Sequence, residues 1–403
     1  MPAVNLDDIY EQMGECIEMR SDLLAGMHLT LAVPLTMRLV DSEPAWLLLV
    51  GGPSTGKTML LQNLRNSDRV SWIDDLTPNT LLSGFRDEQQ LAKGEAMTLA
   101  GRAQSLDKKT LLIPDLTVVI NKGQQSREIF DQFRLLFDGS FTKEYGNKVV
   151  ASFNGKVNLL GGVTEAIDTI ITQTVALGER FLQWRMSPLS ESQIKAIAMM
   201  AILGDKGKKR SHEKLSRMCR DMVDGGRFPH PEISEEQARA LGAYSTYTTS
   251  LRSHSARPSK SAAVLAPPQQ EGPARVARQL ASIAKGLAMV RRATAVSTGD
   301  MYIVKQIALC SMTKARMLCL AELVDAKYNT KKVLSHYSLM DPLKITADQA
   351  LNTMYDLYRC RVVNKYKSPS SGDDYSWGLT EEASKVIEQA EMVEMLLEEV
   401  KYA

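Results

Sequence analysis

The first half of the chain alternates between short apolar runs and stretches in which apolar residues recur every three or four positions. Short runs are typical of strands buried on both faces, whereas the wider spacing is typical of helices packed on one face. This alternation of strands and helices predicts an α/β fold, a parallel sheet sandwiched by helices. Strands are predicted at 45–50, 70–75, 109–117 and 156–164, a hairpin at 141–153, and helices over 5–40, from 59 onward and over 126–138.

Helical spacing dominates the second half of the chain. Residues 187–250 are predicted to be helical, with a basic cluster at 206–210 placed in a loop. An exposed connector, mobile in part, is predicted at 252–274, where proline and polar residues gather. Helices return over 275–327, so this half is predicted to consist mainly of packed helices.

A different order of elements appears after about residue 312, where helices lead into a hairpin. The predicted strands at 361–367 and 375–379 flank a polar loop, and a helix opening near 346 precedes them. Three helices and a two-stranded wing predict a winged helix. An acidic amphipathic helix is predicted over 381–402.

A glycine-rich stretch after the strand at 45–50 fits the pattern G-x-x-x-x-G-K-[ST]. Glycines let the backbone wrap close to a phosphate chain, so that the loop amides point at negative charge. Lys57 is expected to reach the β- and γ-phosphates, and the Thr58 hydroxyl is expected to ligate Mg²⁺. The stretch therefore predicts ATP and Mg²⁺ as cofactors. The residues expected to hold the nucleotide are Gly51, Gly52, Pro53, Ser54, Thr55, Gly56, Lys57 and Thr58.

A second candidate ligand for the metal ends the strand at 109–117. Apolar residues precede Asp115, which is the pattern of a Walker B strand whose carboxylate holds Mg²⁺ through water. Thr58 and Asp115 are therefore the predicted metal residues.

The composition limits which partners and which cell compartment can be expected for the chain. A net charge of +2 over 403 residues gives no general attraction to nucleic acid, so a polyanion site must come from local clusters. Five cysteines without C-x-x-C spacing are expected to be free thiols in a reducing cytosol. No signal peptide is recognised, and no apolar run approaches the ~20 residues of a membrane span. We expect a cytoplasmic protein with no membrane partner.

These parts, in this order, resemble the AAA+ ATPases and, within them, the clade of minichromosome maintenance (MCM) helicases. The resemblance covers about residues 40–327. It implies that Thr164 is sensor 1, which orients the attacking water, and that Arg180 is an arginine finger that reaches a neighbour's ATP. Arg278, or failing that Arg275, is implied to be sensor 2. A site completed by a neighbour implies a homo-hexamer or a similar ring.

The same resemblance gives the hairpin at 141–153 a role. MCM-like proteins carry a pre-sensor-1 hairpin there, which projects into a central channel and follows single-stranded DNA. It implies that Lys143, Tyr145 and Lys148 contact DNA without reading its sequence. The residues alone leave open that these lysines only keep a hairpin soluble, and that Arg180 forms a surface ion pair.

One position departs from the MCM pattern. MCM proteins follow the Walker B Asp with a Glu that acts as the general base, whereas this chain has Leu116. Either the base is displaced or the chemistry is slow. Asp74 and Asp75 end the strand at 70–75 and could approach the γ-phosphate from the side. They could equally serve as helix caps and surface charge.

The resemblance also predicts the division of the chain and its function. We expect an oligomeric AAA+ ATPase that couples hydrolysis to DNA translocation or unwinding, as a replication helicase or initiator. A remodelling ATPase without helicase activity, in transposition, defence or regulation, stays open, as does a DNA-binding regulator switched by nucleotide. The predicted parts are a helical lead-in (1–40), an AAA+ core (41–187), a helical lid with its connector (188–327) and a winged-helix domain with the last helix (328–403).

A second group is also similar: prokaryotic, phage and mobile-element AAA+ ATPases with a strand of K-D-F-T type. Asp115 and Thr117 keep that pattern, while Pro114 and Leu116 depart from it. The similarity implies a protein of prokaryotic, phage or mobile-element type.

Overall fold

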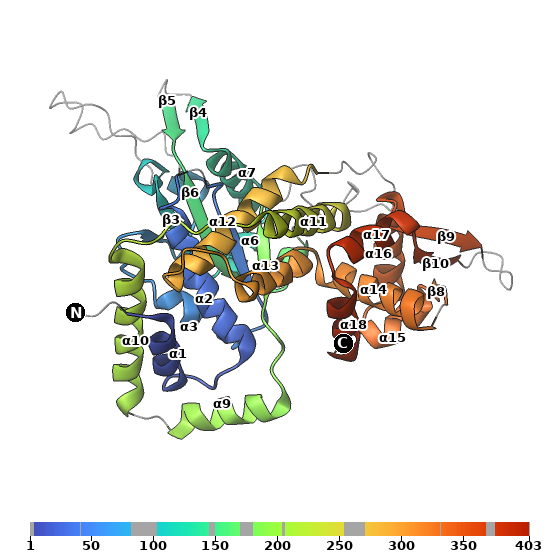
Figure 1. Ribbon diagram of the computed structural model, residues 1–403, viewed down its shortest axis with the longest axis horizontal. Helices are drawn as coiled ribbons and strands as arrows, with labels where there is room; N and C mark the ends of the chain where they lie inside the picture. Colours follow the sequence, from blue (N-terminus) through green and yellow to red (C-terminus); the bar gives the residue numbers. More distant parts are fainter. Residues whose placement is uncertain are drawn as a thin grey trace. The chain divides into compact units, whose positions relative to one another are not determined.

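The chain divides into two units, which are described in turn (Figure 1). The first unit comprises Met1–Ile167, Trp184–Ile233 and Ala281–Ile303, and the second comprises Asp168–Gln183, Ser234–Leu280 and Val304–Ala403. The computed structural model describes residues 4–40, 42–81, 103–144, 150–169, 180–203, 206–253, 271–330, 332–367 and 375–402.

The first unit combines a central sheet with helices on both of its faces. Its helices are α1 (Leu6–Gly14), α2 (Ser21–Thr36), α3 (Lys57–Gln62), α4 (Pro78–Leu81), the 3₁₀ turn η1 (Ala103–Leu106), α6 (Thr117–Ile120), α7 (Gln124–Asp138), α9 (Glu191–Leu203) and α10 (Lys206–Asp224). Its strands are β1 (Trp46–Val50), β2 (Val70–Trp72), β3 (Lys109–Ile113), β4 (Ser140–Glu144), β5 (Val150–Asn154) and β6 (Val157–Val163). Strand β7 (Leu182–Arg185) and helices α12 (Ala274–Val290) and α13 (Thr298–Cys310) contain residues of both units.

Five strands form the central sheet, in the order β2-β3-β6-β1-β7. The pairs β2–β3, β3–β6 and β6–β1 are parallel, and Gly161 of β6 lies opposite both Leu48 and Ile113. Every residue of β1 and β6 is buried, which explains why β1 reads as an unbroken apolar run and β6 as one interrupted only by Asn158. The predicted α/β class is confirmed.

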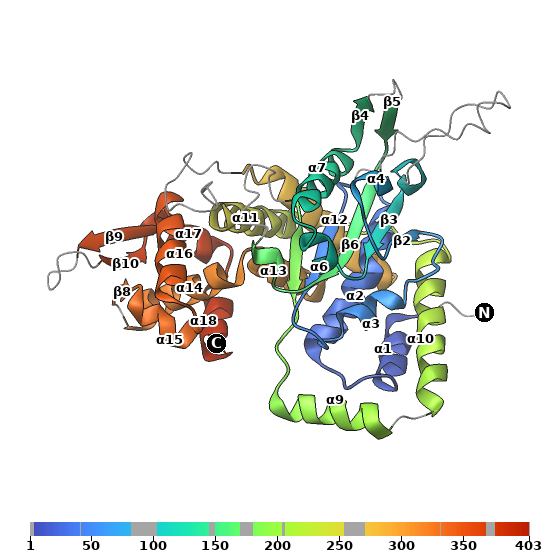
Figure 2. The same cartoon turned by 180° about the vertical axis from the view of Figure 1, so that it is seen from behind.

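Helices cover both faces of this sheet, as the register shows. Asn158 and Gly162, on one face of β6, contact α2 and α3 respectively. Trp46 lies opposite Leu159 and therefore on the other face, where its ring meets Phe133 of α7 edge-on at 5.9 Å. The first unit is thus a three-layer arrangement of helix, sheet and helix (Figure 2).

A two-stranded hairpin extends from this unit beyond α7 (Figures 1 and 2). Strands β4 and β5 pair antiparallel, with Ser140 opposite Asn154 and Glu144 opposite Val150, so the predicted hairpin is confirmed. Gly139, with φ of +76°, ends α7 and turns the chain into β4. Only two residues separate β5 from β6, and the hairpin therefore continues directly into the centre of the sheet.

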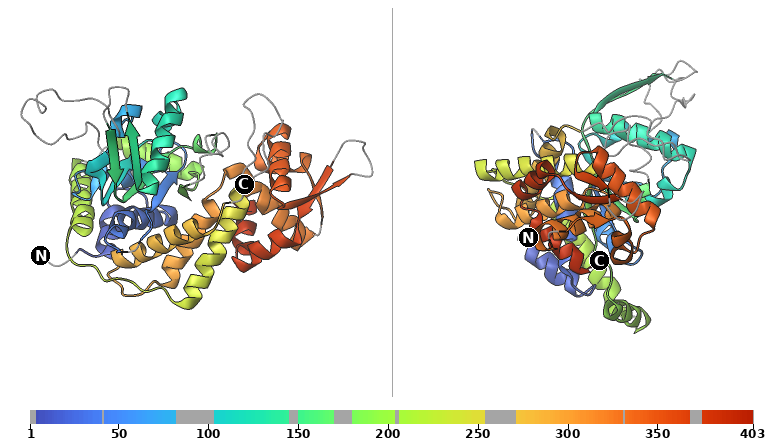
Figure 3. Two further views of the ribbon diagram at one scale, coloured as in Figure 1. Left: turned by 90° about the horizontal axis from the view of Figure 1, so that it is seen from above. Right: turned by 90° about the vertical axis from the view of Figure 1, so that its right-hand side faces the viewer.

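The second unit is built mainly of helices, with a small antiparallel sheet at one end of them (Figure 3). Its sheet has the order β8-β10-β9, and Trp377 of β10 is fully buried against the edge of the Tyr355 ring from α16, at 5.3 Å. Its further elements are α11 (Glu235–Arg252), α14 (Lys314–Asp325), the π-helix η3 (Ala326–Thr330), β8 (Leu334–Ser335), the 3₁₀ turn η4 (Tyr337–Leu339), α15 (Met340–Leu343), α16 (Ala347–Arg359), β9 (Val363–Lys367), β10 (Tyr375–Leu379), α17 (Glu381–Gln389) and α18 (Val393–Tyr402).

Two local predictions are wrong. The basic cluster at 206–210 begins helix α10 rather than forming a loop. The single helix predicted over 381–402 is two helices, because Glu391 between them adopts a positive φ of 53°. Most of the predicted connector at 252–274 and the loop at 368–374 lie outside the described residues.

Within the described residues, the structure contains no helix that is both long and apolar enough to cross a membrane. The four-part division of the chain stays a prediction.

Candidate nucleotide-binding site

The glycine-rich loop connects the carboxyl end of β1 to the start of α3, as predicted. Its first residue is tied to the sheet, because the Gly51 amide donates to the Val163 carbonyl at 3.1 Å. Gly56 has φ of +100°, and a methyl group there would lie 2.7 Å from Cδ2 of Leu23. The last turn of the loop therefore requires glycine for both its backbone and its packing. On the outer side of the loop, Ser54 and Thr58 are exposed.

Lys57 fills the inside of this loop. Its ammonium donates to the carbonyl oxygens of Gly51 and Gly52, each at 2.6 Å, and lies 3.3 Å from Oγ1 of Thr55. Burial lowers the Lys57 pKa, and the nearby charge of Asp115 acts in the opposite direction. The loop thus surrounds a cation whose three donors could turn from these carbonyls to the oxygens of a phosphate.

A buried pair supports the loop from below, and the sequence alone did not indicate it. Arg20, just before α2, donates to the Thr55 carbonyl at 3.2 Å and pairs with Asp22 at 2.9 Å. Asp22 in turn accepts the amide of Ser187 at 2.9 Å. The N-terminal helices are therefore fastened to the glycine-rich loop, although no motif in the lead-in marks these residues.

The ends of β3 and β6 are joined by two threonines. The Thr117 amide donates to Oδ1 of Asp115 at 2.9 Å, which orients the carboxylate after β3. Thr117 Oγ1 donates to Thr164 Oγ1 at 3.3 Å and accepts the Thr164 amide at 3.1 Å. Thr117 thus connects the predicted Walker B acid to the predicted sensor 1.

The strand order brings the glycine-rich loop, Thr164 and Asp115 together at the edge of the sheet formed by the carboxyl ends of its strands. Because β6 lies between β1 and β3, Thr164 at its carboxyl end stands between the loop after Val50 and Asp115. Neighbouring strands are about 4.8 Å apart, so β1 and β3 are separated by about 10 Å. A triphosphate with its metal fits such a span, and ligands of open parallel sheets bind at this edge.

Asp74 and Asp75 lie at the same edge but farther along it, after β2. Strand β2 is three positions from β1, which corresponds to about 14 Å. Asp74 accepts the indole N–H of Trp72 at 2.7 Å, and Asp75 accepts a hydrogen bond from Lys122, which lowers the Asp75 pKa. Their predicted role as base stays a prediction, and each carboxylate already has a structural partner.

Leu116, which stands where the MCM pattern has Glu, is turned into the core. Its side chain is 0% exposed, and its amide donates to the Gly162 carbonyl at 2.7 Å. At Gly162 a methyl group would lie 2.5 Å from the carbonyl oxygen of Pro114, so β3 and β6 approach closely at this point. Position 116 is thus enclosed by protein, whereas Asp115 beside it is exposed.

The three predicted arginines belong to the second unit. Arg180 is only 8% exposed, and its carbonyl accepts a hydrogen bond from Gln279 at 3.1 Å. Arg275 and Arg278 lie at the start of α12, where Arg275 pairs with Glu271 at 3.6 Å and Arg278 is exposed. Their roles stay predictions.

The predicted DNA contacts are only partly described. Lys143 lies on β4, while Tyr145 and Lys148 lie outside the described residues. Strand β6 separates the hairpin from the nucleotide edge, because β5 leads into its amino end and Thr164 follows its carboxyl end. Seven residues of strand span about 20 Å.

The chain matches no protein-family model and has no significant match among curated proteins. Its function is therefore inferred from its own residues and their geometry.

Proposed function

We propose that the chain is an ATPase of AAA+ type that binds ATP with Mg²⁺ at the carboxyl edge of its parallel sheet. One observation carries this proposal: Lys57 in its glycine-rich loop, Thr164 and Asp115 follow three adjacent strands, β1, β6 and β3. The resemblance to AAA+ ATPases assigns each group a part in one phosphoryl-transfer site.

The residues fit the chemistry of that site. In triphosphate sites Mg²⁺ takes one or two protein oxygens, with phosphate and water as the remaining ligands. The exposed Thr58 hydroxyl and the Asp115 carboxylate, oriented by the Thr117 amide, supply that number. Lys57 would neutralise charge on the phosphates, and Thr164, held through Thr117, would place the attacking water.

Hydrolysis by this site is expected to be slow. No acid follows Asp115 in the chain, because the next residue is Leu116, whose side chain is buried. A general base contributes typically 10²- to 10⁴-fold to such a step, so a displaced base is a large loss. Asp74 or Asp75 remains the proposed substitute, and replacing each with Asn tests it: unchanged turnover in both variants removes them from the mechanism.

The proposed work of the ATPase is on DNA, as an MCM-like helicase or initiator. The hairpin β4–β5 supports it, because it projects from the unit and continues into the strand that ends at Thr164. Lys143, Tyr145 and Lys148 would touch the strand, and residues 328–403 would form a winged helix. In a ring, Arg180 would complete a neighbour's site, which requires it to leave its buried position, and Arg278 would stabilise charge on the γ-phosphate.

A nucleotide-switched DNA-binding regulator is the second candidate. The buried Leu116 favours it, because slow hydrolysis suits a switch better than a motor. The two candidates differ in turnover: DNA accelerates ATP hydrolysis by a helicase but not by a switch.

The nucleotide site is tested with Lys57→Ala. We expect the affinity for a fluorescent ATP analogue to fall about ten- to hundredfold, the equivalent of one charge-assisted hydrogen bond. Lys156→Ala is the matched control, because Lys156 precedes the opposite, amino end of β6 and its ammonium donates to the Ser42 carbonyl. Equal binding by both variants, with melting temperatures unchanged, refutes the proposed site.

The DNA function is tested separately, by ATP turnover with and without single-stranded DNA. We expect DNA to stimulate turnover in the native chain and much less in the double variant Lys143→Ala, Lys148→Ala. The control removes the exposed lysines Lys195 and Lys385 instead. Unstimulated turnover together with salt-insensitive binding would leave an ATPase but no helicase. Gel filtration with a non-hydrolysable nucleotide tests the ring, and a persistent monomer excludes the role of Arg180.

A further inference from the structure

Helix α10 concentrates positive charge in a chain that is otherwise nearly neutral. Its 19 residues include seven lysines and arginines and three acids, a net charge of +4, against +2 for all 403 residues. A local excess of this kind is the electrostatic footprint of a polyanion site, provided that the charges face solvent together.

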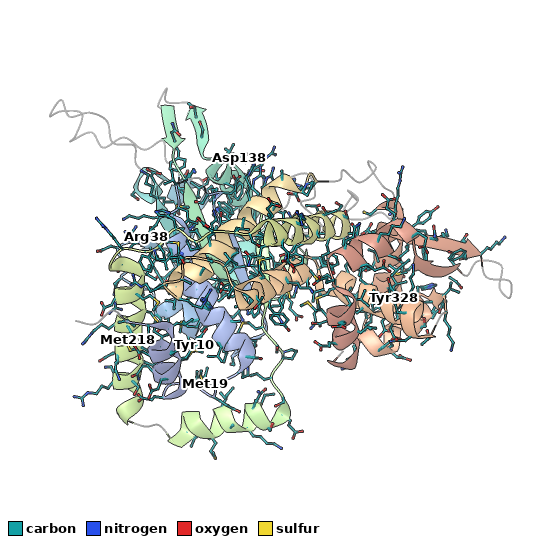
Figure 4. The ribbon with its side chains drawn as sticks, viewed as in Figure 1. Tyr10, Met19, Arg38, Asp138, Met218 and Tyr328 are labelled. Carbon is teal, nitrogen blue, oxygen red and sulfur yellow. The ribbon has the colours of Figure 1, made fainter. Side chains whose placement is uncertain are left out.

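The apolar face of α10 is already occupied. Leu215, Cys219 and Met222 are buried, and the helix packs against α1 and α2. Ser216 donates to Asn63 at 2.9 Å along the same face. Figure 4 shows Tyr10 of α1 beside this helix, on the side opposite its projecting side chains. A basic amphipathic helix can insert into a bilayer only through its apolar face, and this face is not available.

The outward face presents basic residues one turn apart. Arg210, Lys214 and Arg217 follow the spacing i, i+4, i+7 and are all exposed. Among the described residues, none of the three forms an ion pair. Glu213 and Asp221 are also exposed on this helix, and the charge of Lys214 helps to lower the pKa of Glu15. Positive charge still predominates, with one basic residue per turn of about 5.4 Å.

Arginines of neighbouring segments extend this surface past the end of α10. Arg38 donates to the carbonyl oxygens of Val223 and Gly226, each at 2.9 Å, and Figure 4 shows it near that end. Its guanidinium lies 4.7 Å from the ring centroid of Phe228, and that of Arg292 lies 4.0 Å from the same ring. Burial, together with the charges of Arg69 and Arg292, lowers the Arg38 pKa. The charge of Asp224 acts in the opposite direction, so three arginines, Arg38, Arg69 and Arg292, gather near one acid.

We propose that the outward face of α10, extended by these arginines, binds the phosphate backbone of a nucleic acid. The step from Arg210 to Arg217 covers about 10 Å of helix, the length over which one strand of a duplex presents about three phosphates. Such contacts hold a strand without reading its sequence. This surface is separate from the β4–β5 hairpin and requires no nucleotide, so it stands whether or not the proposed ATPase does.

The test is the triple variant Arg210→Gln, Lys214→Gln, Arg217→Gln. Glutamine matches lysine and arginine in helix propensity, so α10 should persist, and an unchanged melting temperature checks this. Binding to a fluorescent duplex of about 30 bp is followed by anisotropy from about 50 to 200 mM salt, without nucleotide.

We expect the affinity to fall about tenfold or more, and the slope of log K against log salt to lose about 2.7, or 0.9 for each phosphate contact. The control carries the same change of charge at three other exposed positions: Lys195→Gln, Arg239→Gln and Lys385→Gln. Variants of the hairpin or of Lys57 are expected to keep the contribution of α10, which separates this proposal from the proposed function.

Two results overturn the proposal. One is equal affinity and equal salt slope in the triple variant and its control. The other is binding of polyglutamate or of phosphatidylserine vesicles as tightly as DNA at the same salt concentration, because the surface would then accept any polyanion.

Discussion

Replacing Leu116 with Glu restores the acid of the MCM pattern, and we expect it to damage the fold rather than speed hydrolysis. The Leu116 side chain is 0% exposed, so a Glu there loses about 1.5–3 kcal/mol of apolar burial. A buried carboxyl must also stay protonated, and from a pKa of about 4.3 this costs about 3.7 kcal/mol at pH 7, at 1.36 kcal/mol per unit. The total is about 5–7 kcal/mol, comparable to the stability of many domains.

The second of these two costs depends on pH, and its sign can be checked. The folded-state pKa of a buried Glu is raised above its unfolded value, so stability is fully present below about pH 4.3 and is lost as pH rises. Leu116→Glu should therefore lose about 1.4 kcal/mol of unfolding free energy per pH unit between pH 5 and 7. Leu116→Gln should lose a similar amount of stability through packing, but without this dependence on pH. Leu116→Met should reduce the unfolding free energy by less than about 1.5 kcal/mol.

Urea denaturation followed by tryptophan fluorescence measures these differences. In a Trp377→Phe background the remaining tryptophans, Trp46, Trp72 and Trp184, all belong to the first unit. An equal pH dependence in the Glu and Gln variants would show that position 116 is solvated. Faster ATP turnover in Leu116→Glu would show that the side chain reaches the nucleotide edge, and either result refutes our reasoning.

Three further predictions concern buried or half-buried polar groups. Burial lowers the pKa of His28, whose Nε2 lies 2.9 Å from the Leu287 carbonyl oxygen. Stability should therefore be full above the unfolded pKa of about 6.5 and fall as the pH drops below it, a loss that melting curves of His28→Gln should not show. Asn158→Asp should lower the melting temperature more than Asn158→Ala at pH 7, because it leaves a buried charge where an amide donated two hydrogen bonds. Thr117→Val should reduce ATP turnover about tenfold without changing nucleotide affinity, because Thr164 loses its hydrogen-bond partner. Thr117→Ser keeps the hydroxyl and should retain turnover. Steady-state kinetics of the two variants measures the difference.

Local patterns predicted the parts of the site that are continuous in the chain. The strand, the glycine-rich loop and the following helix lie within about 20 consecutive positions, and the buried strands read as apolar runs. The link from Thr117 to Thr164 could not be predicted in this way, because it exists only where β6 inserts between β3 and β1. The support of Thr55 by Arg20 is likewise set by packing between distant segments.

Some errors also have physical causes. The basic cluster at 206–210 was predicted to lie in a loop, but burial of Leu215 and Cys219 where the helix packs against α1 and α2 stabilises this segment as a helix. The break between α17 and α18 carries no glycine or proline. Glu391 takes the left-handed position of a Schellman motif, in which its amide donates to the Glu388 carbonyl at 2.8 Å and the Met392 amide donates to the Ile387 carbonyl at 3.0 Å.

The continuity of β5 with β6 has a mechanical consequence. Strand β6 is hydrogen-bonded along both sides to parallel neighbours, β1 and β3. A force applied to the hairpin along the strand axis therefore loads all the hydrogen bonds on both sides together, in shear, rather than breaking them one after another. Shear is the stiffer of these two geometries, because all the bonds resist together. A displacement of the hairpin along the strand axis would therefore be transmitted through β6 to Thr164 with little loss.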